Sequence, residues 1–195
     1  MNKIYITANQ LLEDSFALAM DILESGYRPT FLIAVWRGGT PIGIAIQEML
    51  AYHGLQTNHI SVRTSSYTGI DQRAKQVRVH SLGYAVDTLR ASDRLLIVDD
   101  VHDSGLSVEE LIAQIRLQCG DDCPQDIRLA TVYYKPKKSQ VARVPDYYIH
   151  QTNDWLVFPH ELVGLSETEI ASEKPGLRDV VKRMGPAGKL PRKSE

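Results

Sequence analysis

Short runs of apolar residues alternate along this chain with longer segments whose apolar positions recur at helical spacing. The short runs are typical of buried strands, and we expect strands at residues 31–35, 59–63, 94–100 and 127–135, with extended segments at 147–150 and 155–158. The longer segments predict helices at residues 11–23, 42–50 and 108–118, and a shorter one at 177–184. Short apolar strands that alternate with helices predict an α/β fold, in which helices cover both faces of a parallel sheet.

Two polar segments fall outside this alternation. Residues 65–77 are polar and contain Gly69, so we expect a mobile loop there. Residues 166–195 mix both charges with prolines and glycines, which predicts a solvated tail after the short helix. The expected organisation is therefore one domain over residues 1–165, followed by a C-terminal helix and a flexible tail over 166–195.

Candidate site residues follow four of the expected strands. In parallel sheets ligands bind beyond the carboxyl ends of the strands, so residues at these ends are expected to converge. The four groups are Arg37-Gly38-Gly39, Ser65-Ser66-Tyr67, Asp99-Asp100 and Lys135.

The strand at 94–100 carries the most informative motif. Four apolar residues end in Asp99 and Asp100, and Asp103 precedes the turn Ser104-Gly105-Leu106-Ser107 into the next helix. Backbone N–H groups at a helix N-terminus can hold a phosphate, while carboxylates can hold ribose hydroxyls, Mg²⁺ or a proton in transit. A phosphorylated sugar is the ligand that needs both. The alternative is a plain strand followed by a helix that one of the two serines caps.

Other phosphate-binding motifs do not fit this turn. A P-loop would need Gly-x-x-x-x-Gly-Lys-Ser/Thr, and a dinucleotide site would need more glycines than Gly105.

The net charge of −2 over 195 residues gives no general attraction to nucleic acid or to an anionic membrane. We expect no secretory signal and no membrane span. The two cysteines, Cys119 and Cys123, are too few for a zinc site and suit reduced thiols in a cytoplasmic protein.

Residues 31–161 resemble the type I phosphoribosyltransferases, most closely the bacterial enzymes for 6-oxopurines (hypoxanthine and xanthine–guanine). The matching motifs occur in family order: the Arg37 loop, Ser65-Ser66-Tyr67 followed by Gln72-Arg73, the acidic strand with its turn, Lys135-Pro136, and residues 153–161. The resemblance implies the type I phosphoribosyltransferase fold, with a small hood contributed by the terminal segments. It also implies a Mg²⁺-dependent purine salvage enzyme. Such an enzyme transfers the 5-phosphoribosyl group of phosphoribosyl pyrophosphate (PRPP) to hypoxanthine, guanine or xanthine.

The same resemblance implies a role for each matched residue. Those that bind PRPP and its pyrophosphate are Arg37, Gly38, Gly39, Ser66 and Tyr67, with Arg73 as a catalytic residue in a mobile lid. Asp99 and Asp100 hold the ribose hydroxyls and Mg²⁺, and the 5′-phosphate lies on Asp103, Ser104, Gly105, Leu106 and Ser107. Asp103 is also the general base near purine N7, and the purine is bound by Lys135, Trp155 and Leu156. The peptide bond before the arginine is often cis in this family; here that bond is Trp36–Arg37.

Several positions leave alternatives open. Serine replaces the commoner threonine at two positions of the phosphate turn, which keeps both hydroxyls. His102 replaces an apolar residue and either packs against the turn or carries a proton. Trp155 is the residue expected to stack on the purine; the alternative is that Trp155 and Phe158 are both core aromatics. His160 stands where the xanthine–guanine group often has a second tryptophan.

Two other functions are compatible with the motifs. One is a regulatory protein on the same fold that senses PRPP or a nucleotide without turnover. The other is a phosphoribosyltransferase for another base, such as orotate, uracil or adenine. By analogy with the family we expect a homodimer or homotetramer.

Overall fold

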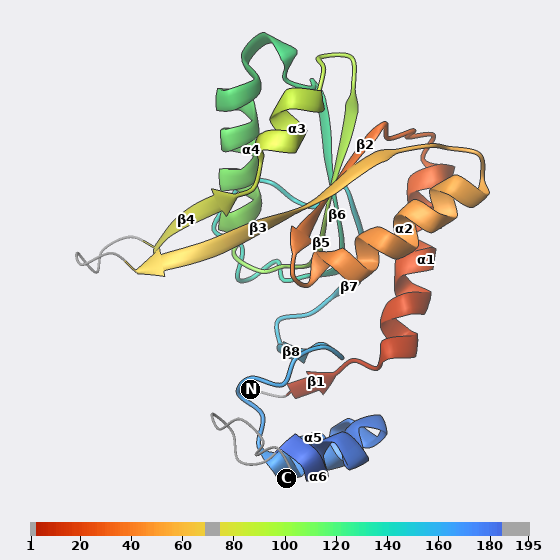
Figure 1. Cartoon of the computed structure of the whole chain (residues 1–195), viewed down its shortest axis with the longest axis vertical. Helices are drawn as coiled ribbons and strands as arrows, with labels where there is room; N and C mark the ends of the chain where they lie inside the picture. The colour runs from red at the N-terminus through yellow and green to blue at the C-terminus, as the bar shows by residue number, and fades with distance from the viewer. Residues whose placement is uncertain (1–2, 69–74, 185–195) are drawn as a thin grey trace, which may run out of the picture. The chain divides into compact units, whose positions relative to one another are not determined.

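The computed structural model describes residues 3–68 and 75–184, without the side chains of 66–68, 75–76, 182 and 184, and divides into two compact units. The central unit comprises residues 11–153, and the terminal unit comprises residues 1–10 together with 154–195. The elements in chain order (Figure 1) are β1 (Lys3–Tyr5), α1 (Ala8–Glu24), β2 (Phe31–Trp36), α2 (Gly39–Tyr52), β3 (Asn58–Thr68), β4 (Lys75–His80), α3 (Gly83–Thr88), β5 (Arg94–His102), α4 (Leu106–Cys119), a 3₁₀ turn (Gly120–Asp122), β6 (Asp126–Tyr134), β7 (Tyr147–Gln151), β8 (Trp155–Val157), α5 (Glu167–Glu173), a 3₁₀ turn (Pro175–Leu177) and α6 (Arg178–Met184).

A six-stranded sheet forms the middle of the central unit. Its strand order is β4-β3-β2-β5-β6-β7, and every neighbouring pair is parallel except β3 and β4. Figure 1 shows α3 and α4 on one side of this sheet and α1 and α2 on the other. The predicted α/β class, with a mostly parallel sheet between helices, is confirmed.

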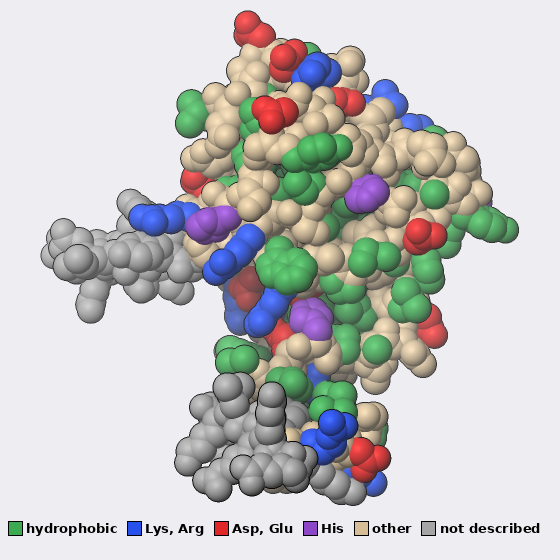
Figure 2. Space-filling model, in the orientation of Figure 1, with side chains coloured by type: hydrophobic (Ala, Val, Ile, Leu, Met, Phe, Trp, Pro, Cys, Tyr) green, Lys and Arg blue, Asp and Glu red, His purple; other side chains and the backbone are tan. Residues whose placement is uncertain are grey.

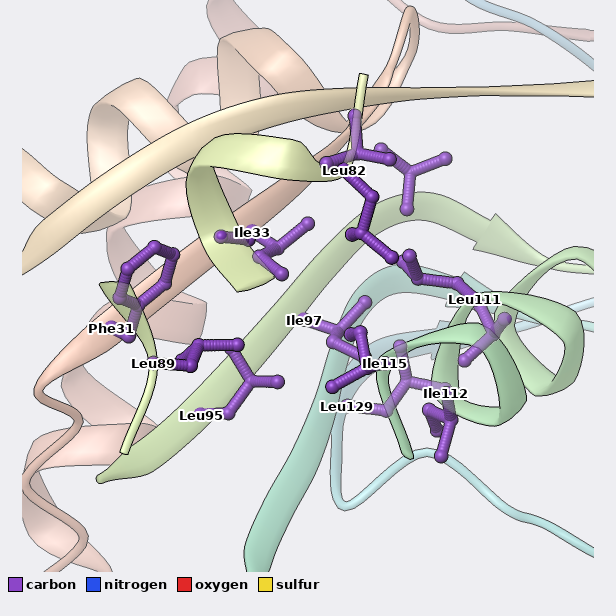
Figure 3. Close-up of a cluster of buried hydrophobic side chains, with 14 of the residues drawn as sticks. Phe31, Ile33, Leu82, Leu89, Leu95, Ile97, Leu111, Ile112, Ile115 and Leu129 are labelled. Carbon is purple, nitrogen blue, oxygen red and sulfur yellow. The ribbon is translucent and has the colours of Figure 1, made fainter. Parts of the chain in front are cut away.

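Buried aliphatic side chains hold α3 and α4 against the sheet. Figure 3 shows β2, β5 and β6 directing Phe31, Ile33, Leu95, Ile97 and Leu129 toward the leucines and isoleucines of the helices and of the residues next to them. All five of these strand side chains are at most 1% exposed. Burying one such side chain contributes about 1.5–3 kcal/mol, so this cluster fixes the strands whose carboxyl ends carry the site.

The opposite face depends on a close approach of α2 to β2. A Cβ atom at Gly43 would lie 2.8 Å from the Cβ of Ala34, which is closer than two carbon atoms can pack. Ile42 and Ile46, on the same helix, are fully buried.

The described residues include no helix that is both long and apolar enough to cross a membrane.

The terminal unit is built around a two-stranded sheet. Strands β1 and β8 pair in parallel, with Lys3 opposite Trp155 and Tyr5 opposite Val157. The amide of Ile6 continues the ladder by donating to the Val157 carbonyl at 3.0 Å. The first and last parts of the chain therefore fold together here, at a separation of about 150 residues in sequence.

One prediction from the polar segments is wrong, and one helix in the tail was missed. Residues 65–77 were expected to form a loop, but β3 continues to Thr68 and pairs with β4 in an antiparallel hairpin, with Ser65 opposite Arg78. Within the expected loop, only residues 69–74 lie outside the described part. Polar residues dominate this edge hairpin, so the alternation of apolar and polar positions along its strands was missed. Val77 and Val79 were the signal of that alternation. In the tail, α5 was not predicted, because seven residues give too little periodicity to detect.

Candidate functional site

The loop after β2 lies against the carboxyl end of β5. A Cβ atom at Gly38 would lie 1.7 Å from an Asp100 carboxylate oxygen, and one at Gly39 would lie 2.3 Å from the Val98 carbonyl oxygen. Gly39 therefore requires glycine, and a side chain at position 38 would displace the Asp100 carboxylate. The Trp36–Arg37 peptide bond is cis, as the family resemblance predicts, and Arg37 is exposed beside the N-terminus of α2. The arrangement gives a fixed cation and backbone amides for an anion such as pyrophosphate.

Asp99 and Asp100 end the buried part of β5. The Asp100 amide donates to an Asp99 carboxylate oxygen at 3.0 Å, and the Val101 amide donates to Asp100 at 2.8 Å. Burial, together with the negative charge of Asp100, raises the pKa of the Asp99 carboxyl well above its usual value. A polar or cationic ligand at this point would offset the cost of keeping two adjacent carboxylates ionised.

The turn from β5 into α4 has the form of an anion cradle. Gly105 is in the left-handed conformation with φ of 79° and immediately precedes α4. A Cβ atom there would lie 2.3 Å from a methyl carbon of Val141 and 2.8 Å from the His102 ring. The Gln140 amide donates to the Ser104 carbonyl at 3.0 Å, which ties the turn to the segment after β6. This second support was not predicted, because it joins residues 36 positions apart.

Lys135 and Asp103 form an ion pair at this end of the sheet. The Lys135 ammonium donates to an Asp103 carboxylate oxygen at 3.0 Å. The lysine side chain is 6% exposed, whereas that of Asp103 is 43% exposed. Strand pairing brings the two together, because the Lys135 amide donates to the His102 carbonyl at 2.9 Å. The result is a buried cation next to an accessible carboxylate. The ammonium can donate to an acceptor of a ligand while the carboxylate accepts from a neighbouring donor of the same ligand.

His102 packs beneath the phosphate turn. It is 1% exposed, and its ring lies 5.6 Å from that of Tyr134, centroid to centroid. Burial lowers its pKa, so the ring is neutral at physiological pH. Of the two roles considered from the sequence, packing against the turn is the one that this position supports.

An exposed row of side chains crosses the sheet next to the Arg37 loop. Trp36, Arg63 and His80 are neighbours on β2, β3 and β4, and all are exposed. Figure 2 shows Lys or Arg and His side chains beside apolar ones on the surface of these strands. Arg63 adds a second positive charge close in the sheet to Arg37, a feature that sequence reasoning missed because it depends on the register of β2 and β3.

The structure gives no position relative to this point for several predicted site residues. Ser66 and Tyr67 lie within β3, and their side chains are outside the described part; Arg73, with Gln72, is outside it altogether. Trp155 and Leu156 belong to the terminal unit. There Trp155 is 55% exposed, whereas Leu156 and Phe158 are 6% and 2% exposed. Phe158 is thus a core aromatic, and Trp155 is free to contact a ligand.

The acidic strand end suits Mg²⁺ that is shared with a substrate. No group of three or more acidic, histidine or cysteine side chains that could hold a metal occurs among the described residues. Asp99 and Asp100 provide two carboxylates, and Mg²⁺ commonly binds to one or two carboxylates while substrate phosphates and water supply the other ligands. The donor set therefore fits a metal that arrives with a phosphorylated ligand.

Comparison with known families gives one match that spans most of the chain. Residues 5–163 match the family model described as the phosphoribosyl transferase domain. A search of the curated proteins finds no significant match.

Solved structures support the same fold. A purine phosphoribosyltransferase from Pyrococcus horikoshii is 29% identical with a TM-score of 0.68, and the match covers 85% of this chain and 99% of that one. A hypothetical protein from Neisseria gonorrhoeae with bound ppGpp is 19% identical, with a TM-score of 0.70 and coverages of 92% and 97%. A xanthine-guanine-hypoxanthine phosphoribosyltransferase from Helicobacter pylori is 19% identical, with a TM-score of 0.61 and coverages of 80% and 92%.

The buried acidic pair predicts an unusual effect of mutation on stability. Because burial raises the pKa of Asp99, the folded state favours its neutral form, and its contribution to stability falls as pH rises above the usual aspartate value. Asp99→Asn should therefore raise Tm at pH 7.5 in Mg²⁺-free buffer, by about 2–4 °C for each 1 kcal/mol gained. The gain should shrink toward pH 4. Scanning calorimetry across this pH range measures both, with the exposed Asp87→Asn as control. A lower Tm than wild type at pH 7.5 contradicts the prediction.

Proposed function

Since the chain belongs to the phosphoribosyl transferase domain family, we propose that it transfers the 5-phosphoribosyl group from PRPP to a 6-oxopurine. The products are a nucleoside 5′-monophosphate and pyrophosphate. Hypoxanthine and guanine are the proposed bases, with xanthine as a third candidate. The 29% identical Pyrococcus enzyme, described as a purine phosphoribosyltransferase, supports the choice of a purine.

The ion pair of Lys135 and Asp103 is the observation that carries this proposal. A 6-oxopurine in its N7–H form offers an acceptor, O6, next to a donor, N7–H, on one edge. Lys135 and Asp103 offer the complementary donor and acceptor 3.0 Å apart. Adenine has an amino donor at position 6, which would face the ammonium of Lys135 without an acceptor.

The residues around the pair would hold PRPP at three points. Arg37 and the amides of Gly38 and Gly39 bind the pyrophosphate, and the turn from Ser104 to Ser107 binds the 5′-phosphate. The carboxylates of Asp99 and Asp100 accept the ribose hydroxyls and hold Mg²⁺. When bound, this ion neutralises charge on the leaving pyrophosphate.

The reaction then needs one bond to form, one to break and one proton to move. Purine N9 forms a bond to ribose C1′ as the bond from C1′ to the pyrophosphate oxygen breaks, and the electron pair leaves with pyrophosphate. The N7 proton passes to the Asp103 carboxylate, which Lys135 keeps in place. We propose that Arg73, which lies outside the described residues, belongs to a lid that keeps water from the sugar centre.

A second candidate is a protein that binds a phosphorylated nucleotide without turnover. The observation that favours it is the Neisseria structure of the same fold, which holds ppGpp. Asp103, Lys135 and the complete phosphate turn favour the enzyme, because binding alone does not need a proton acceptor. A phosphoribosyltransferase for orotate, uracil or adenine is the third possibility, and base preference separates it.

We further propose that the protein acts in the cytoplasm as a homodimer or homotetramer. The family resemblance supports both suggestions. Sedimentation of the purified protein measures the oligomeric state.

The first test of this function is pyrophosphate release from PRPP and Mg²⁺ with a panel of bases. We expect turnover with hypoxanthine and guanine that exceeds turnover with adenine at least tenfold, the scale of one unpaired buried donor. Lys135→Ala should lose this preference while its affinity for PRPP changes little. Lys137→Ala, which removes an exposed lysine two residues away, is the control.

The result of the panel separates the candidates. No pyrophosphate release with any base, together with tight nucleotide binding, would support the sensing protein. Equal use of adenine and hypoxanthine would remove the 6-oxopurine assignment and leave the phosphoribosyltransferase.

The second test concerns the proton acceptor. Asp103→Asn keeps the shape of the turn but cannot accept the N7 proton, so kcat should fall roughly a hundredfold or more. The Kd for PRPP, measured by titration calorimetry, should stay within about threefold because backbone amides hold the phosphate. The exposed Asp121→Asn serves as control. Equal losses in kcat and PRPP affinity would show that Asp103 acts only on the shape of the turn.

A further inference from the structure

Helix α5 lies beyond the part of the chain that matches the family model. The match ends at residue 163, and α5 begins at Glu167. Its N-terminus is a capping box, in which Ser166 and Glu169 bond to each other's backbone amides. Seven residues make a helix too short to be stable alone, so α5 depends on what it binds.

The C-terminal end of α5 is fixed by a buried lysine. Lys174 is 9% exposed, and its ammonium donates to the Phe158 carbonyl at 2.7 Å and to the Pro159 carbonyl at 3.1 Å. Burial lowers its pKa, and Glu161 offsets this in part. A buried ammonium is costly unless it is well paired, so its two carbonyl bonds hold the chain immediately after β8.

The N-terminal end of α5 is fixed to β1. The Glu169 carboxylate accepts hydrogen bonds from the Lys3 ammonium and, at 2.9 Å, from the Tyr5 hydroxyl. These bonds, together with those from Ser166, lower the pKa of Glu169 to about 2. One carboxylate therefore joins the cap of α5 to two residues of β1.

These two attachments act on the two strands of one small sheet. Strands β1 and β8 have three residues each, and a two-stranded sheet is marginally stable by itself. Helix α5 binds one strand through Glu169 and the chain after the other strand through Lys174. The residue opposite Lys3 in this sheet is Trp155, the proposed stacking residue.

We propose that α5 is a brace that positions the purine-binding strand β8, with Lys174 and Glu169 as positioning residues. The inference rests on the proposed function and on the purine contact that the family resemblance implies for Trp155. Every residue proposed to hold PRPP lies in the central unit, whereas the brace and Trp155 lie in the terminal unit. Loosening the brace therefore weakens purine binding without changing PRPP binding. A general loss of folding would change both.

Steady-state kinetics of Lys174→Met and Glu169→Gln test the brace. We expect each variant to raise KM for hypoxanthine by about tenfold, equivalent to about 1.4 kcal/mol, while KM for PRPP changes less than twofold. Lys174→Arg should restore much of the purine KM, because arginine can still donate to both carbonyls. Arg178→Met and Glu167→Gln remove exposed charges of the same segment and should have no effect.

Fluorescence gives a readout that does not depend on activity. Trp36 and Trp155 are the two tryptophans of the chain, so Trp36→Phe leaves Trp155 as the sole reporter. In this background Lys174→Met and Glu169→Gln should lower the anisotropy of Trp155 and increase its quenching by acrylamide, with the far-UV circular dichroism unchanged.

The two readouts keep the brace and the proposed function apart. Absence of turnover in the wild-type protein would overturn the function, and the fluorescence would still decide whether α5 fixes Trp155. An unchanged purine KM with unchanged Trp155 anisotropy overturns the brace. Equal losses in both KM values and kcat, matching a loss of folded protein, overturn it as well.

Discussion

The site depends on the close approach of the loop after β2 to the end of β5. Hydrogen atoms in place of side chains at Gly38 and Gly39 let this loop lie against Asp100 and the Val98 carbonyl. Strands β2 and β5 are direct neighbours in the sheet. Their parallel pairing, with Ala34 opposite Val98, and their shared core residues keep the carboxyl ends of the two strands next to each other. The exposed Arg37 with its loop amides and a pair of carboxylates consequently lie side by side, as the proposed ligand, with a pyrophosphate on a sugar carbon, requires.

The proposed purine contacts belong to two units of the chain: Asp103 and Lys135 lie in the central unit, and Trp155 lies in the terminal unit. Strands β5 and β6 place Asp103 and Lys135 within 3.0 Å of each other over a fully buried core. Burial and the charge of Asp100 raise the pKa of Asp99, and a pKa shifted in this way is typical of a group kept for a ligand rather than for folding. The proposed purine-stacking residue, Trp155, belongs to the terminal unit, where α5 is its proposed brace.

The sequence predicted the parts of the fold that repeat a simple pattern. Buried strands and amphipathic helices gave the parallel sheet, and polar residues after strands marked Arg37, Asp99 and Lys135 as neighbours. The second half of β3 and all of β4 escaped prediction because polar residues dominate these segments, and α5 because it is short and held by residues far away in sequence. The pairing of Lys135 with Asp103 and the position of Arg63 depend on strand register, which hydrophobic periodicity does not specify. Whether Trp155 is exposed or lies in the core with Phe158 likewise depends on the packing of β8.

A crystal structure of the protein with PRPP and Mg²⁺ is the most direct test of the central claim, that one end of the sheet is built for a phosphorylated sugar. We expect the pyrophosphate against Arg37 and the amides of Gly38 and Gly39, with the ribose hydroxyls on Asp99 and Asp100. We expect the 5′-phosphate within hydrogen-bond distance of the amides between Ser104 and Ser107. PRPP bound elsewhere, or bound with its 5′-phosphate away from this turn, would show that this end of the sheet is not built for a phosphorylated sugar.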